Sequence, residues 1–152
     1  MIYETDIGPI SLGIVKGALV CEFGRHQFDQ EPTNLLARQF ADYFDGKKIT
    51  RFSAEIPEGP SLTQRCWKVC RSIPYGRTIS YKELAEMAGS PKAVRAAGQA
   101  MKRNPLPIIT PCHRVLSSSG KLHGYAGKTA VKSKELKRKQ FLLDLEQGTM
   151  QP

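Results

Sequence analysis

The stretch Asn104-Pro-Leu-Pro-Ile-Ile-Thr-Pro-Cys-His-Arg-Val115 places a cysteine directly between a proline and a histidine. Its three prolines fix φ and push the residues before them toward extended conformations. The chain that enters Cys112 is therefore stiff and delivers the thiol to one place. Pro111 also suits the start of a short helical turn at Cys112, where free N–H groups would favour a thiolate. Cys112 and His113 are the candidate reactive pair.

A structural cysteine is the alternative interpretation of Cys112, because an isolated cysteine is usually a small buried apolar residue. The proline frame, Asn104 upstream and the sequence on both sides favour the reactive interpretation.

The five residues Pro111-Cys-His-Arg-Val115 resemble the active-site motif of the O6-alkylguanine-DNA alkyltransferases, also called methylated-DNA–protein-cysteine methyltransferases. The resemblance extends from about Trp67 to about Glu146, and residues 1 to about 55 carry only a loose likeness. It includes three further motifs, namely Tyr75-Gly-Arg-Thr-Ile-Ser-Tyr81, the segment from Ser90 to Ala97, and Gly124-Tyr-Ala-Gly127.

The resemblance implies transfer of an alkyl group from O6 of guanine to the sulfur of Cys112, once per molecule. Such a displacement at carbon needs a thiolate. By resemblance, His113 takes the thiol proton, Glu146 orients the imidazole, and Tyr81 donates a hydrogen bond to the purine. Asp144 is a rival to Glu146 on spacing alone.

The resemblance also implies a set of residues that bind the DNA and the flipped base. Extrusion of a base costs a few kcal/mol, and the family arginine that fills the vacated stack corresponds to Arg95. The others are Ala96 and Ala97 in the minor groove, Asn104 between the recognition helix and the active-site strand, the carbonyl groups of Cys112 and Val115, Tyr125 as a pocket wall, and Ala126 where the family often has serine. Two alternatives stay open: the small residues can serve helix packing in the core, and Asn104 can be an ordinary helix C-cap.

Charge is unevenly distributed along the 152 residues, whose net charge is +9. Residues 1–60 contain 6 Lys and Arg against 9 Asp and Glu, whereas residues 61–152 contain 17 against 5. Segregation of this kind indicates a polyanionic partner for the second half. The expected partner is double-stranded DNA that contains O6-alkylguanine.

The pattern predicts an α+β fold in two domains, with a boundary at the Pro57–Pro60 linker. Residues 1–56 are expected to form a small supporting α/β domain: a hairpin or meander over 2–28, a helix over Asn34–Phe44 with the stripe Leu35, Leu36, Phe40 and Phe44, and a strand over 51–56. Residues 57–152 are expected to form a mostly helical domain for DNA binding and alkyl transfer.

Four helices are predicted in the second domain. Ser61 is the candidate N-cap of a helix that ends at Ser72, and Ser80 with Glu83 forms a capping box for a helix that ends at Met87. A third helix runs from Ser90-Pro91 to about Arg103 and makes a helix-turn-helix with the second. The fourth helix covers 131–146, and its basic residues, including Lys134, Lys137 and Lys139, are expected to contact phosphates.

Other classes of protein fit the sequence less well. No apolar run has the ~18 residues of a membrane span, and the first residues lack the pattern of a secretory signal. We therefore expect a cytoplasmic protein, or a nuclear one in a eukaryote, that acts as a monomer without a cofactor. Cys21 and His26 could be two zinc ligands, but no second pair with convincing spacing follows.

Two rival functions remain. A non-catalytic helix-turn-helix protein that binds alkylated DNA would have no need of a reactive Cys112. A cysteine hydrolase would need oxyanion donors, and the sequence offers none beyond the backbone of the motif itself.

Overall fold

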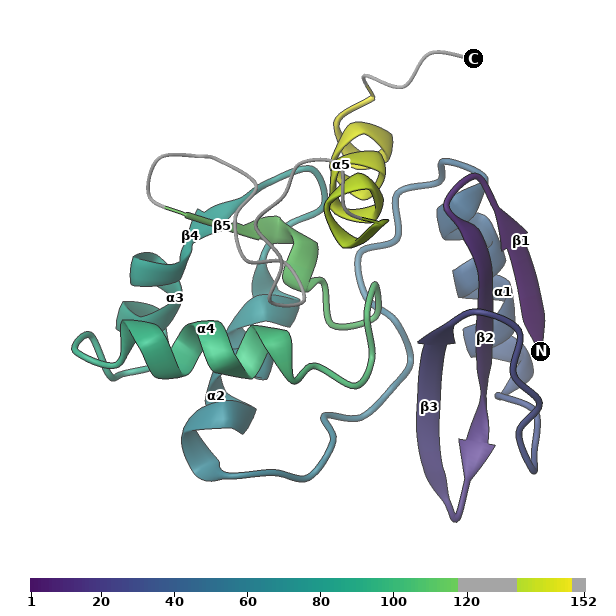
Figure 1. Cartoon of the computed structure of the whole chain (residues 1–152), viewed down its shortest axis with the longest axis horizontal. Helices are drawn as coiled ribbons and strands as arrows, with labels where there is room; N and C mark the ends of the chain where they lie inside the picture. Colours follow the sequence, from purple (N-terminus) through teal and green to yellow (C-terminus); the bar gives the residue numbers. More distant parts are fainter. Residues whose placement is uncertain (118–133, 149–152) are drawn as a thin grey trace.

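The computed structural model describes residues 1–117 and 134–148. Along the chain, a three-stranded sheet and one helix are followed by a helix, a short strand, two more helices, a short 3₁₀ helix, a second short strand and a final helix. Figure 1 shows the sheet and α1 on one side, α2, α3 and α4 on the other, and α5 between them at the top. The expected α+β fold is confirmed.

The sheet is an antiparallel meander of β1 (Ile2–Thr5), β2 (Gly8–Val15) and β3 (Ala18–Phe23). The turn between β2 and β3 has two residues, Lys16 and Gly17, whose φ angles are 51° and 79°. Two positive φ values match the twist of a tight hairpin, which is why a glycine stands there. The meander confirms the prediction for residues 2–28.

Helix α1 (Asn34–Phe44) has the predicted bounds and covers one face of the sheet. Thr33 is its N-cap and accepts a hydrogen bond from the Leu36 amide. The predicted apolar stripe is partly wrong, because Leu35 is 54% exposed and Tyr43 faces the core instead.

The predicted strand over residues 51–56 does not form. The carbonyl groups of Ala54 and Glu55, which a sheet would have paired, accept hydrogen bonds from the guanidinium of Arg71 on α2. This segment is therefore anchored by a side chain rather than by a neighbouring strand.

The helical half begins with α2 (Ser61–Ser72), whose N-cap is Pro60 and not the predicted Ser61. Helix α3 (Tyr81–Met87) has the predicted capping box of Ser80 and Glu83. Helix α4 (Val94–Lys102) starts later than predicted, because Ser90 and Ala93 close a turn before it. Trp67 of α2 donates a hydrogen bond of 2.9 Å to the Ala100 carbonyl and fixes α4 against α2.

The motif around Cys112 joins two apolar clusters. Leu106, Ile108 and Ile109 pack with the sheet, α1 and Phe52, whereas Cys112 and Val115 pack with α2, α3 and α4. Helix α5 (Lys134–Gln147) contributes to both clusters, through Leu142 and Leu136 respectively. The candidate reactive pair therefore lies at the junction of the two halves.

Candidate active site

The loop that leads to Cys112 is held by side chains at both of its ends. The Asn104 amide donates to the Thr110 carbonyl at 2.7 Å, and its oxygen accepts from the Leu106 amide at 2.9 Å. Arg71 donates to the Thr110 hydroxyl at 2.9 Å. Asn104 thus closes the loop between α4 and the motif, while the C-cap of α4 is Arg103.

Backbone strain is stored in the same loop at Ile108, which has a φ of 75°. A β-branched residue in this region is an outlier that costs about 1–3 kcal/mol and persists only where its surroundings enforce it. Ile108 is 1% exposed within the cluster that packs on the sheet. The expectation of a stiff path into Cys112 agrees with this arrangement.

Cys112, His113 and Arg114 form the 3₁₀ helix η1 directly after Pro111, as the sequence suggested. The three residues are 6%, 0% and 4% exposed. Strand β5 (Val115–Leu116) follows at once and pairs in parallel with β4 (Ile79–Ser80). This pairing sets the start of α3, and with it Tyr81, beside the motif.

The Glu146 carboxylate is the centre of a buried hydrogen-bond network. His113 Nε2 lies 2.6 Å from Glu146 Oε2, and Arg114 donates from Nε at 2.7 Å and from Nη2 at 3.0 Å. The Tyr43 hydroxyl donates to Oε2 at 2.5 Å, and the Gly76 amide donates to Oε1 at 3.3 Å. Gly76 has a φ of 80°, and a Cβ there would lie 3.2 Å from the Glu146 carbonyl oxygen, so a side chain would strain this approach.

Asp144, the rival on spacing, does not meet His113. Its carboxylate accepts a hydrogen bond of 2.8 Å from Gln140 on the exposed side of α5. Glu146 is the carboxylate that the fold brings to the imidazole.

The network fixes which nitrogen of His113 can act as a base. Burial raises the pKa of Glu146, but the hydrogen bonds from His113 and Arg114 and the Arg114 charge hold it far below its usual range, so the carboxylate is an anion. An anion at 2.6 Å requires a proton on Nε2. Among the described residues Nδ1 is buried without a hydrogen-bond partner. Nδ1 is therefore the basic nitrogen.

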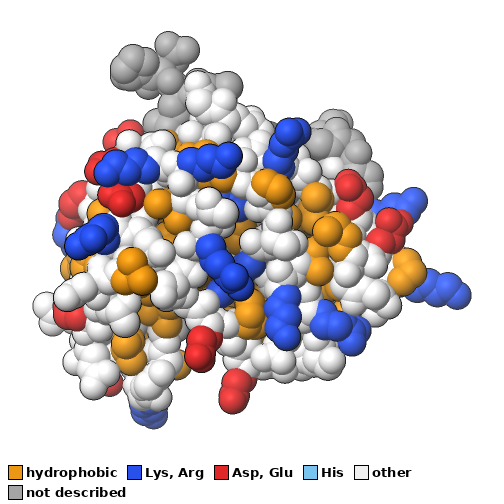
Figure 2. Space-filling model, turned by 180° about the vertical axis from the view of Figure 1, so that it is seen from behind, with side chains coloured by type: hydrophobic (Ala, Val, Ile, Leu, Met, Phe, Trp, Pro, Cys, Tyr) orange, Lys and Arg blue, Asp and Glu red, His pale blue; other side chains and the backbone are white. Residues whose placement is uncertain are grey.

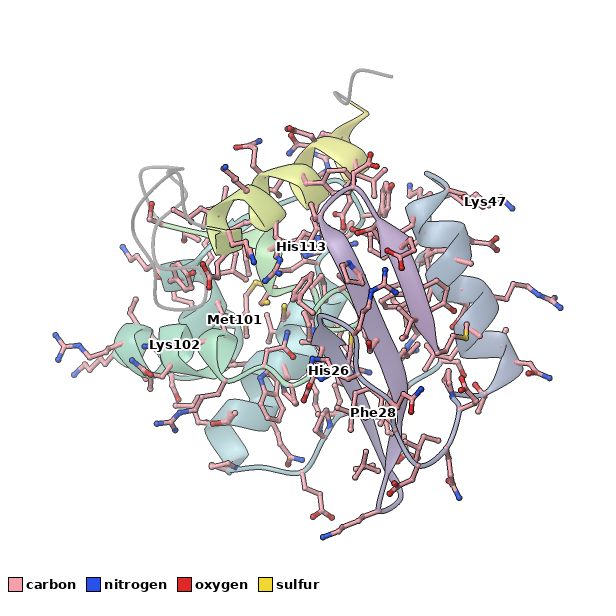
Figure 3. The ribbon with its side chains drawn as sticks, turned by 45° about the vertical axis from the view of Figure 1, so that its right-hand side comes forward. His26, Phe28, Lys47, Met101, Lys102 and His113 are labelled. Atoms are coloured by element: carbon pink, nitrogen blue, oxygen red, sulfur yellow. The ribbon has the colours of Figure 1, made fainter. Side chains whose placement is uncertain are left out.

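Burial keeps the imidazole neutral at rest. Desolvation lowers the pKa of His113 below its ordinary value and outweighs the opposing pull of Glu146. Figure 3 shows His113 inside the molecule beneath α5, whereas Lys102 lies on α4. A neutral, oriented imidazole next to a cysteine in the chain can accept a thiol proton.

Tyr81 packs against the cluster that contains Cys112 and Val115. Burial, together with the Cys112 charge, raises the pKa of Tyr81 to about 12. The phenol therefore keeps its proton at neutral pH and can donate it to a bound base.

The prediction that Lys139 contacts a phosphate is wrong, because Lys139 is fully buried. It donates a hydrogen bond of 2.7 Å to the Val115 carbonyl, and Nζ lies 5.9 Å from the Tyr81 ring centroid. Burial lowers its pKa to about 8, against the charges of Cys112 and Cys70. Lys134 and Lys137 of the same helix are exposed, as predicted.

The predicted DNA-binding residues of α4 separate into two faces. Arg95 and Ala96 are exposed, whereas Ala97 is fully buried against α2 and α3, so Ala97 is not available to DNA. The alternative of core packing is correct for Ala97 and Ala100. Figure 2 shows Lys and Arg side chains on both halves of this face, among them several between the centre and the edge where α2, α3 and α4 lie.

Two predicted site residues, Tyr125 and Ala126, lie outside the described residues, as does the predicted turn after Ser117 and the start of the last predicted helix. Tyr43, Arg114 and Lys139 are site residues that sequence reasoning did not assign. Arg114 could have been predicted as a site residue, because it belongs to the quoted motif.

Three further observations concern metals, membranes and disulfides. Residues 1–117 and 134–148 contain no group of three His, Cys, Asp or Glu that could hold a metal ion. None of the helices described combines the length and apolar character of a membrane span. The four cysteines carry free thiols.

Comparison with known proteins places the chain in a family. Residues 61–148 match the family model of the 6-O-methylguanine DNA methyltransferase DNA-binding domain. A methylated-DNA–protein-cysteine methyltransferase of Methanosarcina barkeri is 40% identical over 98% of this chain and 97% of its own length. A constitutive enzyme of the same name from Bacillus subtilis is 46% identical over 72% of this chain and 62% of its own.

A solved structure agrees with the same assignment. The crystal structure of Mycobacterium tuberculosis OGT in complex with DNA superposes with a TM-score of 0.79 at 36% identity, over 97% of this chain and 92% of that one. The sequence and fold comparisons together show that the chain belongs to the methylated-DNA–protein-cysteine methyltransferase family.

Proposed function

We propose that this protein repairs O6-alkylguanine in duplex DNA by transferring the alkyl group to its own Cys112. The proposal rests above all on the 2.6 Å contact between His113 and Glu146. His113 lies in the same turn as Cys112, and Glu146 lies on α5. A binding-only protein would have no use for a buried, oriented imidazole beside a cysteine. A hydrolase would need oxyanion donors, and the sequence offers none beyond the backbone of the motif itself.

The proposed reaction begins with loss of the thiol proton to Nδ1 of His113, directly or through a water. The sulfur then attacks the alkyl carbon and the bond from that carbon to O6 breaks, so the electron pair passes to guanine. Tyr81 donates a proton to the leaving guanine, and its phenolate then takes up, through water, the proton that His113 accepted, so that only Cys112 is changed at the end. The carbonyl groups of Cys112 and Val115 accept from the guanine amino group.

The product is a thioether on Cys112, and nothing in the sequence suggests a way to remove it. Each molecule therefore acts once. A neutral thiol is a poor nucleophile, so the rate depends on how well His113 takes its proton.

Binding to DNA is assigned to α3 and α4, which act as a helix-turn-helix. Exposed Arg95 fills the space that the flipped base leaves, and exposed Ala96 lets the backbone approach the minor groove. Phosphate contacts from the basic half make the binding strong but weakly dependent on sequence.

The proposal includes the domain roles and the setting. Residues 1–56 form the supporting domain and residues 57–152 the domain for DNA binding and transfer, and the apolar cluster on the sheet side also takes in Leu106, Ile108, Ile109 and Leu142 of the second domain. The protein acts as a monomer, in the cytoplasm or, in a eukaryote, in the nucleus.

The test uses the Cys112→Ala variant with duplex DNA that carries O6-methylguanine. Binding of the variant to this DNA should equal that of the wild-type protein, while loss of the lesion should stop. Continued lesion loss with Cys112→Ala would reject the proposal. Equal binding with no lesion loss by either protein would favour the binding-only function.

A further inference from the structure

We propose that Tyr43 is a positioning residue for alkyl transfer, because its hydroxyl holds the Glu146 carboxylate against His113. The inference rests on the proposed roles of His113 and Glu146. It gives the N-terminal half a part in the reaction through Glu146 and His113, since Tyr43 lies on α1.

The contact joins two elements that are 103 positions apart in the chain. The Tyr43 hydroxyl lies 2.5 Å from Oε2 of Glu146, the same oxygen that lies 2.6 Å from His113 Nε2. Tyr43 is fully buried, and the Glu146 side chain is 1% exposed. Tyr43 therefore acts on the oxygen that faces the imidazole, in a place where water cannot substitute for it.

The Tyr43 ring has little freedom to move away from Glu146. Its centroid lies 5.2 Å from that of Phe44, 5.9 Å from that of Phe52 and 6.1 Å from that of Tyr75. Two of the three contacts are edge-to-face, an arrangement that favours one ring orientation. The aromatic packing of the N-terminal half thus determines where the hydroxyl points.

The hydroxyl is a neutral donor at every relevant pH. Burial and the Glu146 charge raise the pKa of Tyr43 well above its ordinary value. A donor on Oε2 withdraws electron density from the oxygen that accepts from His113 Nε2. Loss of this donor would make Oε2 a stronger acceptor and would favour the protonated imidazole.

Other charged and titratable groups face the same site and stay in place when the Tyr43 hydroxyl is removed. Arg114 of η1 and Lys139 of α5 both lower the pKa of His113. Among the described residues, the site also has Cys112 beside His113 in the chain, Tyr75, whose pKa burial and the Glu146 charge raise, and the Gly76 amide. A change in His113 titration in a Tyr43 variant would therefore report the hydroxyl itself.

The experiment compares Tyr43→Phe with Tyr3→Phe. Tyr3 also lies in the N-terminal half, and its hydroxyl bonds to the Ala37 carbonyl at 2.7 Å and to Met1 Sδ at 3.3 Å, so the control loses a tyrosine hydroxyl whose hydrogen bonds stay within that half. Two quantities are measured: the pKa of His113 by NMR titration of the imidazole, and the single-turnover rate of Cys112 alkylation against pH.

Tyr43→Phe should raise the pKa of His113 and the midpoint of the acid limb of the rate profile by about 0.5–1 pH unit. Tyr3→Phe should leave both at their wild-type values. Site-specific 3,5-difluorotyrosine at position 43 is a stronger donor of similar size, so it should shift both midpoints the other way. This variant preserves the hydrogen bond and serves if Tyr43→Phe folds poorly.

Identical His113 titrations in the wild-type protein and both position-43 variants would overturn the inference and leave Tyr43 with a purely structural role. The NMR titration does not depend on activity. A wild-type protein that leaves Cys112 unmodified would therefore reject the proposed function, while the effect of Tyr43 on His113 would still be decided.

Discussion

Arg114 and His113 are consecutive residues that both donate to the Glu146 carboxylate, Arg114 from Nε at 2.7 Å and His113 from Nε2 at 2.6 Å. One carboxylate therefore neutralises a permanent guanidinium charge and orients an imidazole. In the proposed mechanism, stability and catalysis depend on the same side chain, and double substitution can separate them.

Glu146→Gln should lower the free energy of unfolding by about 3–5 kcal/mol, because it leaves the buried Arg114 charge without a counterion. It should also slow alkyl transfer by at least about tenfold, because His113 loses its anionic partner. Urea unfolding and single-turnover kinetics measure the two effects.

The double variant Arg114→Met/Glu146→Gln removes both charges, so much of the lost stability should return while transfer stays slow. Equal recovery of stability and rate would mean that Glu146 serves the fold alone.

Arg95→Ala should leave stability within about 0.5 kcal/mol of wild type, since Arg95 is exposed. At saturating DNA its transfer rate should fall, because the flipped state would lose the side chain that we propose fills the stack. The reaction of Cys112 with iodoacetamide, which needs no flipped base, should be unchanged.

Lys102→Ala is the matched control on the same helix. Lys102 is exposed, so this variant should weaken DNA binding but keep the transfer rate at saturation. A normal saturated rate for Arg95→Ala would show that Arg95 has no part in flipping.

Replacement of Lys134 and Lys137 by alanine should flatten the salt dependence of DNA binding. Each lost phosphate contact reduces the slope of log K against log salt by about 1. Lys47→Ala removes an exposed lysine from the end of α1 and should keep the wild-type slope. An unchanged slope in the double variant would place Lys134 and Lys137 away from the phosphates.

Lys139 should affect stability with a definite dependence on pH. Its pKa is about 8 in the folded protein and about 10.4 in an unfolded chain. Between these values the unfolded state binds more protons, so stability rises with pH across this window and is lost as pH falls through about 8. Relative to Lys139→Met, the wild-type protein should gain up to about 3 kcal/mol from pH 7.5 to 10.5.

Exposed Lys137 supplies the control for that comparison, since Lys137→Met should follow the wild-type curve in urea unfolding at each pH. A constant difference between wild type and Lys139→Met would show that Lys139 titrates normally.

Local signals in the sequence predicted the elements with local causes. The capping box of Ser80 and Glu83 and the apolar spacing of Asn34–Phe44 act within a few residues, and both helices form as expected. Residues 51–56 do not form the predicted strand. Two of their carbonyl groups accept hydrogen bonds from Arg71, a side chain distant in sequence that no local pattern reveals.

The site was predictable only in part for the same reason. Lys139 lies seven positions before Glu146, which puts both on one face of a helix, and Leu136 and Leu143 mark that face as buried. This spacing was available in the sequence, although the run of lysines suggested a solvated surface. Tyr43 had no such signal, because its contact with Glu146 exists only once the two halves pack together.

The most direct test of the account is the mass of the intact protein after incubation with duplex DNA that contains O6-methylguanine, followed by peptide mapping. The account predicts a gain of one methyl group per molecule, located on Cys112, with unmodified guanine left in the DNA. An unmodified Cys112 after the lesion has disappeared, or a methyl group on another residue, would contradict it.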